Sequence, residues 1–101
     1  RDVEMPPFGR LVALIVSGKD EVAVDDGARN LARTAPKTQE VRVLGPAPAP
    51  IALLRGRHRR RLLLKAKPGV NVQSAVREWL GRARWPKKVR VQIDVDPYSF
   101  F

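Results

Sequence analysis

The chain alternates between blocks of apolar residues with the period of a strand and blocks with the period of a helix. Residues 11–16 form a continuous apolar run bounded by Gly9 and Gly18, which is typical of a central strand covered over most of both faces. Residues 57–65 predict a second long strand, in which a basic run passes directly into three leucines. Alternation divides the side chains of this strand between two faces: Arg60, Leu62 and Leu64 on one, and Arg59, Arg61, Leu63 and Lys65 on the other.

Two further blocks repeat at helical spacing. The apolar positions of the first are Val24, Ala28, Leu31, Ala32 and Ala35, followed by Pro36. Those of the second are Val72, Ala75, Val76, Trp79, Leu80 and Ala83, with Pro86 as the terminator. The S-x-x-D spacing of Ser17 and Asp20 predicts a capping box for the first helix, and Asn71 is a good N-cap for the second. Gly27 weakens the first helix by about 1 kcal/mol relative to Ala, so this helix needs a sheet to pack on.

The remaining blocks predict shorter strands and their connections. Residues 41–43 alternate between apolar and polar positions, which predicts a short strand that stops at Gly45. Proline at every second position of residues 46–50 predicts a stiff, extended loop, which the apolar residues 51–54 pack back onto the core. Residues 89–95 alternate as a strand with one buried face, and Asp96 and Pro97 end it. An extended lead-in, residues 1–7, and an aromatic tail, residues 98–101, flank these elements.

The order is therefore strand, helix, strand, strand, helix, strand. It predicts an α+β, ferredoxin-like βαββαβ sandwich, with a four-stranded antiparallel sheet and both helices on one face. The two most apolar strands would be the central ones. The whole chain, residues 1–101, suits one domain.

Composition narrows the partners. Lys and Arg number 20 against 10 Asp and Glu, and the formal net charge of +10 attracts phosphate or an acidic peptide. Nucleic acid, an acidic protein tail and an acidic domain all remain open. The absence of cysteine excludes disulfides and Cys-based zinc sites, and no apolar run approaches the roughly 20 residues that span a bilayer. We expect a soluble intracellular domain without a membrane partner. Because residue 1 is Arg1, we expect a fragment of something longer.

Catalytic and metal-binding patterns are absent from the sequence. A phosphate loop around Gly18 and Lys19 would need Gly at Ala13 and a hydroxyl at Asp20. Asp94 and Asp96 are interpreted as a strand end, and His58, alone in an arginine run, as a surface or packing residue. No G-x-S-x-G nucleophile motif occurs. We therefore expect no enzyme activity, no catalytic or metal-binding residue and no cofactor in this chain.

Four stretches occur in one order along the chain: residues 6–11 (PPFGRL), 43–49 (VLGPAPA), 55–65 (RGRHRRRLLLK) and 94–97 (DVDP). Together they resemble the carboxy-terminal domain family of PriA, primosomal replication protein N′. The resemblance implies a domain of a superfamily 2, ATP-dependent 3′-to-5′ DNA helicase that restarts stalled replication forks. It also implies a bacterial, cytoplasmic, nucleoid-associated location. ATP, Mg²⁺ and zinc would be bound by other parts of such a helicase. The fold implied is similar to that of a small-subunit ribosomal protein.

The resemblance implies an accessory domain that contributes to fork DNA binding and to docking of the acidic tail of single-stranded DNA-binding protein (SSB). Its partners would be single-stranded and forked DNA, the SSB carboxy-terminal tail and the helicase lobes of the same chain. Candidate DNA contacts are Arg55, Arg57, Arg59, Arg60, Arg61 and Lys65. His58 and Arg60 stand where the family usually has aromatic residues, which favours an electrostatic surface over a base-stacking platform.

For the SSB tail, Gln73 matches a family position implicated in docking. The family's arginine just upstream is replaced by Gly69 and Val70, so Lys67 or Arg77 is expected to substitute. Two alternatives remain open. One is a purely structural domain that packs on the helicase lobes, and the other is a ribosomal-type RNA-binding domain.

Overall fold

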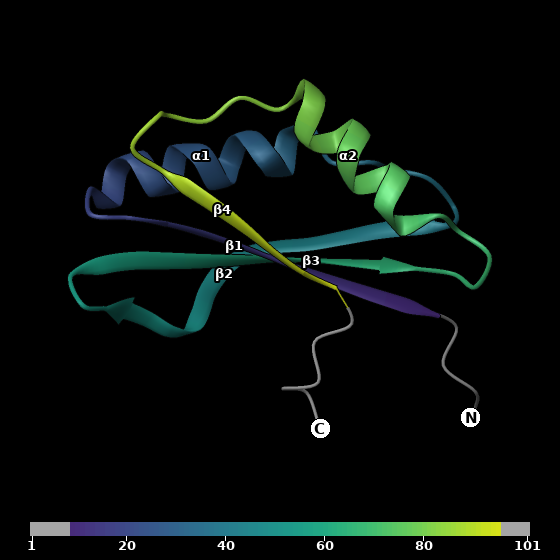
Figure 1. The fold of residues 1–101 in the computed structure, drawn as a ribbon, viewed down its shortest axis with the longest axis horizontal. Coiled ribbons are helices and arrows are strands. Elements are labelled where there is room, and N and C mark those ends of the chain that lie inside the picture. Colours follow the sequence, from purple (N-terminus) through teal and green to yellow (C-terminus); the bar gives the residue numbers. More distant parts are fainter. Residues whose placement is uncertain (1–8, 96–101) are drawn as a thin grey trace.

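The computed structural model describes residues 9–95 of the chain. The elements in order are β1 (Arg10–Gly18), α1 (Glu21–Arg33), β2 (Val41–Leu54), β3 (Arg57–Ala66), α2 (Val72–Arg82) and β4 (Arg90–Val95). They form one antiparallel sheet in the order β2-β3-β1-β4, and both helices cover the same face of it (Figure 1). The predicted ferredoxin-like arrangement is confirmed. The lead-in, the strand end at Asp96 and the aromatic tail lie outside the described residues.

The two most apolar strands are the central pair, as predicted. β1 and β3 pair along their whole length, from Arg10 opposite Ala66 to Gly18 opposite His58. Five apolar residues that point from this pair toward the helices are fully buried: Val12, Leu14, Val16, Leu62 and Leu64. A strand with neighbours on both edges and helices above it needs this apolar continuity, because little of it can reach water.

The start of α1 differs from the predicted capping box. Asp20 is the N-cap residue, and its carboxylate accepts from the amides of Val22 (3.0 Å) and Ala23 (3.3 Å). Ser17 is still part of β1 and is buried, so it cannot cap the helix. The cap prediction at Ser17 is wrong because β1 continues through Gly18, which pairs with His58, so the chain leaves the strand only at Lys19 and the helix is capped one residue later.

The second helix begins at its predicted cap. Asn71 accepts a hydrogen bond from the amide of Ser74 at 3.0 Å. The helix ends at Arg82, before Pro86, because Ala83 is already extended. Trp79 is fully buried, and its indole Nε1 donates to the carbonyl of Leu31 at 2.9 Å, which joins the two helices. Trp79 is therefore a core residue, in agreement with its place on the apolar stripe.

Gly27 has a packing role that explains its place inside a helix. A Cβ at this position would lie 3.3 Å from Cβ of Trp85 and 3.4 Å from the side chain of Val89. The missing side chain thus lets the connection between α2 and β4 lie directly on α1. The intrinsic cost of a helical glycine is offset by this close packing.

The prediction for β2 is wrong in extent. The strand continues past Gly45 to Leu54, through register shifts between residues 44 and 47 and between residues 48 and 53. Proline is tolerated there because β2 is an edge strand, where a missing amide donor breaks few ladder bonds. Ile51, Leu53 and Leu54 are 52%, 57% and 42% exposed, so they do not pack back onto the core. Gly45 is required, because φ is +102° and an added Cβ would lie 2.7 Å from the carbonyl oxygen of Arg61.

Only the first part of β4 has the predicted buried face. Val91 is half-buried, but Ile93 and Val95 are 45% and 39% exposed although they pair with fully buried residues of β1. The outer half of the strand is incompletely covered by α2. An apolar groove remains on the helix side of the sheet.

Candidate nucleic-acid and peptide interfaces

The basic run of β3 is divided by the alternation of the strand. Arg57, Arg59, Arg61 and Lys65 lie on the face away from the helices, which we call the open face. Arg60 lies with Leu62 on the helix side. The division follows the one predicted from sequence, and the structure adds which of the two faces the helices cover.

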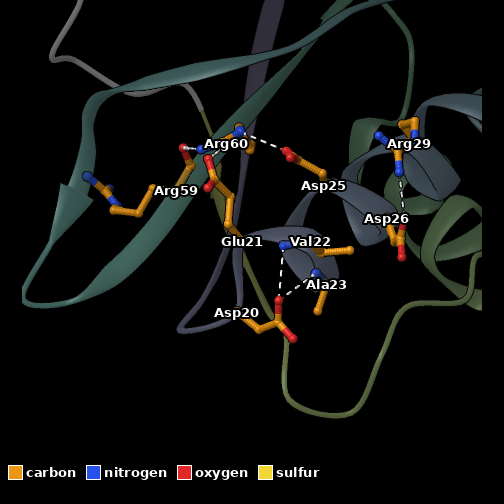
Figure 2. A network of polar contacts seen from close by, with 9 residues as sticks. All are labelled: Asp20, Glu21, Val22, Ala23, Asp25, Asp26, Arg29, Arg59 and Arg60. Carbon is orange, nitrogen blue, oxygen red and sulfur yellow. Dashed lines mark hydrogen bonds and ion pairs between the residues drawn. The ribbon is translucent and has the colours of Figure 1, made fainter.

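Arg60 is an internal link between sheet and helix (Figure 2). Its Nε donates to the Asp25 carboxylate at 2.9 Å and one terminal nitrogen to the Glu21 carboxylate at 3.0 Å. The Arg60 side chain is only 15% exposed. Because these two carboxylates already hold the guanidinium, Arg60 does not contribute to the basic open face.

Carboxylates gather on the α1 side of the molecule. Asp20 pairs with Lys88 at 2.8 Å, and Asp26 forms an ion pair with Arg29 one turn along α1. The hydrogen bond from Lys88, followed by the amide of Ala23, lowers the pKa of Asp20 below its ordinary value of 3.8. These carboxylates therefore neutralise some of the cations on this side, Arg29 and Lys88 among them.

The open face is strongly basic. Strand pairing places Arg42 of β2 beside Lys65, and Ser17 lies between Arg59 and Arg90 of β4. The cations of this face are Arg42, Arg57, Arg59, Arg61, Lys65 and Arg90. Among the paired residues of this face within residues 9–95, Asp94 is the only carboxylate. The sequence analysis did not name Arg42 and Arg90 as candidates. Their alternation with valine predicts that each lies on the polar face of its strand, but it does not show that these faces and the basic face of β3 form one surface.

Two of these arginines are held in place by the protein itself. One terminal nitrogen of Arg57 is 3.3 Å from both the carbonyl oxygen and Oγ of Ser17, and Arg59 donates to the carbonyl of Ile51 at 2.9 Å. A guanidinium has five N–H donors, so each keeps donors for an outside acceptor. Arg55 lies at the tip of the β2–β3 hairpin with φ +53°, next to Gly56 with φ +77°. Positive φ at both positions is typical of a tight two-residue hairpin turn.

Apolar side chains fill the centre of the open face. Leu11, Ile15 and Leu63 are half-buried there, and Leu44 is 43% exposed. None of the paired residues of this face in the described part of the chain is aromatic. Within residues 9–95, the paired residues of this face thus offer guanidinium groups and aliphatic contacts, and none of them supplies a ring on which a base could stack.

A separate groove of about 390 Å³ lies between α2 and β4. Its lining residues are Val72, Gln73, Val76, Arg77, Leu80, Ile93 and Val95. The groove thus combines an apolar lining with one cation, Arg77, and one amide, Gln73. Lys67 does not line it; it follows the end of β3, where its amide donates to the carbonyl of Glu40 at 2.9 Å.

Comparison with known proteins identifies the family. A family model described as the primosomal protein N C-terminal domain matches residues 1–98. The chain belongs to the PriA carboxy-terminal domain family. It is 36% identical to the replication restart protein PriA of Rickettsia conorii over 101 residues, which is 100% of this chain and 15% of that protein. It is 35% identical to PriA of Treponema pallidum over 96 residues, covering 93% of this chain and 15% of the relative.

The chain thus spans about 15% of the length of these curated PriA relatives. The family connects it with DNA replication and the primosome. Within residues 9–95, no group of three or more His, Cys, Asp or Glu side chains is placed to hold a metal ion. Neither helix of this described part is long and apolar enough to cross a membrane.

Proposed function

We propose that the chain is the accessory DNA- and protein-binding domain of a PriA-type replication-restart helicase, and that its open face contacts DNA at the fork. The composition of the open face carries this proposal: its paired residues within residues 9–95 bring several cations together with Asp94 as the only carboxylate, whereas Glu21, Asp25 and Asp26 lie on α1. In such a protein, ATP, Mg²⁺ and zinc would be bound by other domains, and the setting would be the bacterial cytoplasm with the nucleoid.

The chemistry of the open face suits a phosphate backbone and not a base sequence. Arginine pairs bidentately with phosphate, and each phosphate neutralised releases counterions. Affinity should therefore fall steeply with salt, with a slope of about −0.7 to −0.9 in log units for each phosphate contacted. Without aromatic rings, the open face should show little preference among bases.

Paired variants test the DNA interface. Replacing Arg59 and Arg61 together with Gln should lower the affinity for forked and single-stranded DNA and reduce the salt slope by about 1–2 units. The matched control replaces Arg29 and Arg33 of α1 with Gln, which changes the net charge equally on the opposite side of the molecule. Fluorescence anisotropy titrations over a salt series measure both. Equal losses in the two variants would show a general charge effect and refute the open-face assignment.

We further propose that the α2–β4 groove docks the acidic SSB tail. The supporting observation is that Gln73 and Arg77, distant from β4 in sequence, line one groove with Ile93 and Val95. An apolar terminal side chain suits such a lining, and a cation at the rim suits a carboxylate.

Single substitutions test tail docking. In titration calorimetry with an SSB-tail peptide, Arg77→Ala and Gln73→Ala should each weaken binding, whereas Lys67→Ala, outside the groove, should not. A loss confined to Lys67→Ala would move the site away from the groove.

The structural alternative keeps one observation in its favour. The apolar centre of the open face, with Leu44 43% exposed, is also suited to packing on the helicase lobes. In that case, charge reversal at Arg59 and Arg61 would disturb assembly of the full-length protein and leave its DNA affinity unchanged. Membership in the PriA family favours replication restart over the ribosomal-type RNA-binding alternative.

A further inference from the structure

The two edges of the sheet differ in their capacity to accept another strand. The β2 edge carries Pro46, Pro48 and Pro50, and two register shifts interrupt its pairing. Proline removes amide donors, and register shifts bend the strand. Both features hinder the pairing of a further strand at this edge. The β4 edge, Arg90–Val95, has no proline and no register shift, and within the described residues it pairs only with β1. Its outer side is therefore the sheet edge suited to a further strand.

The open edge borders the apolar groove. Ile93 and Val95 point toward the helix side of the sheet and are 45% and 39% exposed, facing the apolar residues of α2 across the groove. Alternate side chains of a strand added beside β4 would point the same way, into this space. The six residues of β4 span about 20 Å, enough to pair with a short extended peptide.

Charge indicates the kind of peptide. Arg77 lines the groove, and the chain carries a formal net charge of +10. On β4 itself, Arg90 and Asp94 point to the open face and not into the groove. We propose that the outer edge of β4 accepts an extended acidic peptide as an additional strand, with alternate apolar side chains in the α2–β4 groove and a carboxylate at Arg77. The inference rests on the proposed tail docking and adds its backbone geometry: main-chain hydrogen bonds supply affinity, and the groove selects the side chains.

Backbone-modified peptides test this geometry on the 101-residue chain. Two versions of the SSB-tail peptide carry N-methyl groups on alternate amides, in one register or the other, with all side chains unchanged. In a strand only one set of amides faces β4, so one version should lose about tenfold in affinity for each pairing amide, and the other should bind like the parent. Amide hydrogen exchange supplies a second measurement, since the outward-facing amides of β4 should gain protection only with the parent and the tolerated version.

Each outcome decides a different point. Equal binding of both methylated versions, with Arg77→Ala still weakening the parent peptide, overturns strand addition and leaves tail docking standing. No binding of the parent peptide overturns tail docking and the strand geometry with it. A stable dimer in light scattering whose β4 amides are already protected without peptide assigns the edge to a second copy of the chain and also overturns the proposal.

Discussion

Arg60 and Arg61 are adjacent in sequence, yet the structure places their side chains on opposite faces of the sheet. We expect Arg60→Gln to lower the free energy of unfolding by about 1.5–2 kcal/mol, because it removes two ion pairs and a hydrogen bond to the carbonyl of Arg59. The partner carboxylates of Asp25 and Glu21 are 38% and 57% exposed, so each ion pair is worth far less than a fully buried one. For a domain of this size the melting temperature should fall by about 6–16 °C.

Urea denaturation followed by circular dichroism measures the change, since urea is uncharged and leaves the ion pairs unscreened. Arg61→Gln is the matched control: it makes the same chemical change on the open face, should leave the urea midpoint almost unchanged and should weaken DNA binding. At about 1 M salt the stability gap between Arg60→Gln and the wild type should shrink, because screening weakens the ion pairs in the wild type.

The opposite pattern would refute this division of roles. An unchanged urea midpoint in Arg60→Gln, together with a loss of DNA affinity as large as that of Arg61→Gln, would show that Arg60 reaches DNA. The helix side of β3 would then belong to the nucleic-acid interface, and the open-face assignment would be wrong.

Other changes test the fold. Gly45→Ala should destabilise the domain by about 2 kcal/mol or more, because positive φ and a 2.7 Å approach to a backbone carbonyl exclude a Cβ. Gly81→Ala should stabilise the domain by up to about 1 kcal/mol, because a Cβ at this position of α2 would meet nothing within 4 Å beyond the adjacent backbone of its own helix. Trp79→Phe should cost about 2–4 kcal/mol, since it opens space in the core and removes the indole hydrogen bond to the carbonyl of Leu31, which then keeps the Thr34 hydroxyl at 3.3 Å. The contribution of Asp20, whose pKa is lowered chiefly by the hydrogen bond from Lys88, should be complete well above pH 3.8 and disappear as the pH falls through the lower folded pKa.

Urea midpoints and thermal melts check all four. A Gly45→Ala variant as stable as Gly81→Ala would contradict the close approach of residue 45 to the carbonyl oxygen of Arg61. Asp20→Asn keeps a capping side chain but does not titrate, so its stability should decline less between pH 5 and pH 2 than that of the wild type. If Asp20→Asn and the wild type lost stability equally between pH 5 and pH 2, the acid-dependent loss would not come from Asp20. An unchanged midpoint in Trp79→Phe would show that its indole hydrogen bond is dispensable.

Local patterns along the sequence were sufficient for the order of elements and for the central strands. Apolar continuity in residues 11–16 and at Leu62 to Leu64 needs no partner to be recognised, because burial on both faces demands it. The stripe through Trp79 likewise predicted the core face of α2. The alternation of residues 57–65 correctly separated Arg60 from its neighbours.

Local sequence patterns gave wrong predictions where pairing with an adjacent strand determines the conformation. Proline at alternate positions predicted a loop after Gly45, but an edge strand requires few donors, so β2 continues through it. The S-x-x-D spacing fits Ser17 as a cap, yet pairing with β3 keeps Ser17 within the strand. Both errors arise because hydrogen-bond partners are assigned across the sheet and not along the chain.

The sequence by itself determined the family, the order of elements and the excess of positive charge. Only the tertiary structure decided which cations share a surface and that Asp25 and Glu21 bind Arg60. It also decided that Gln73 and Ile93 line the same groove. The physical reason is the range of each interaction. Periodicity and capping act over a few neighbouring residues, whereas an interface joins side chains from strands and helices that only folding brings together.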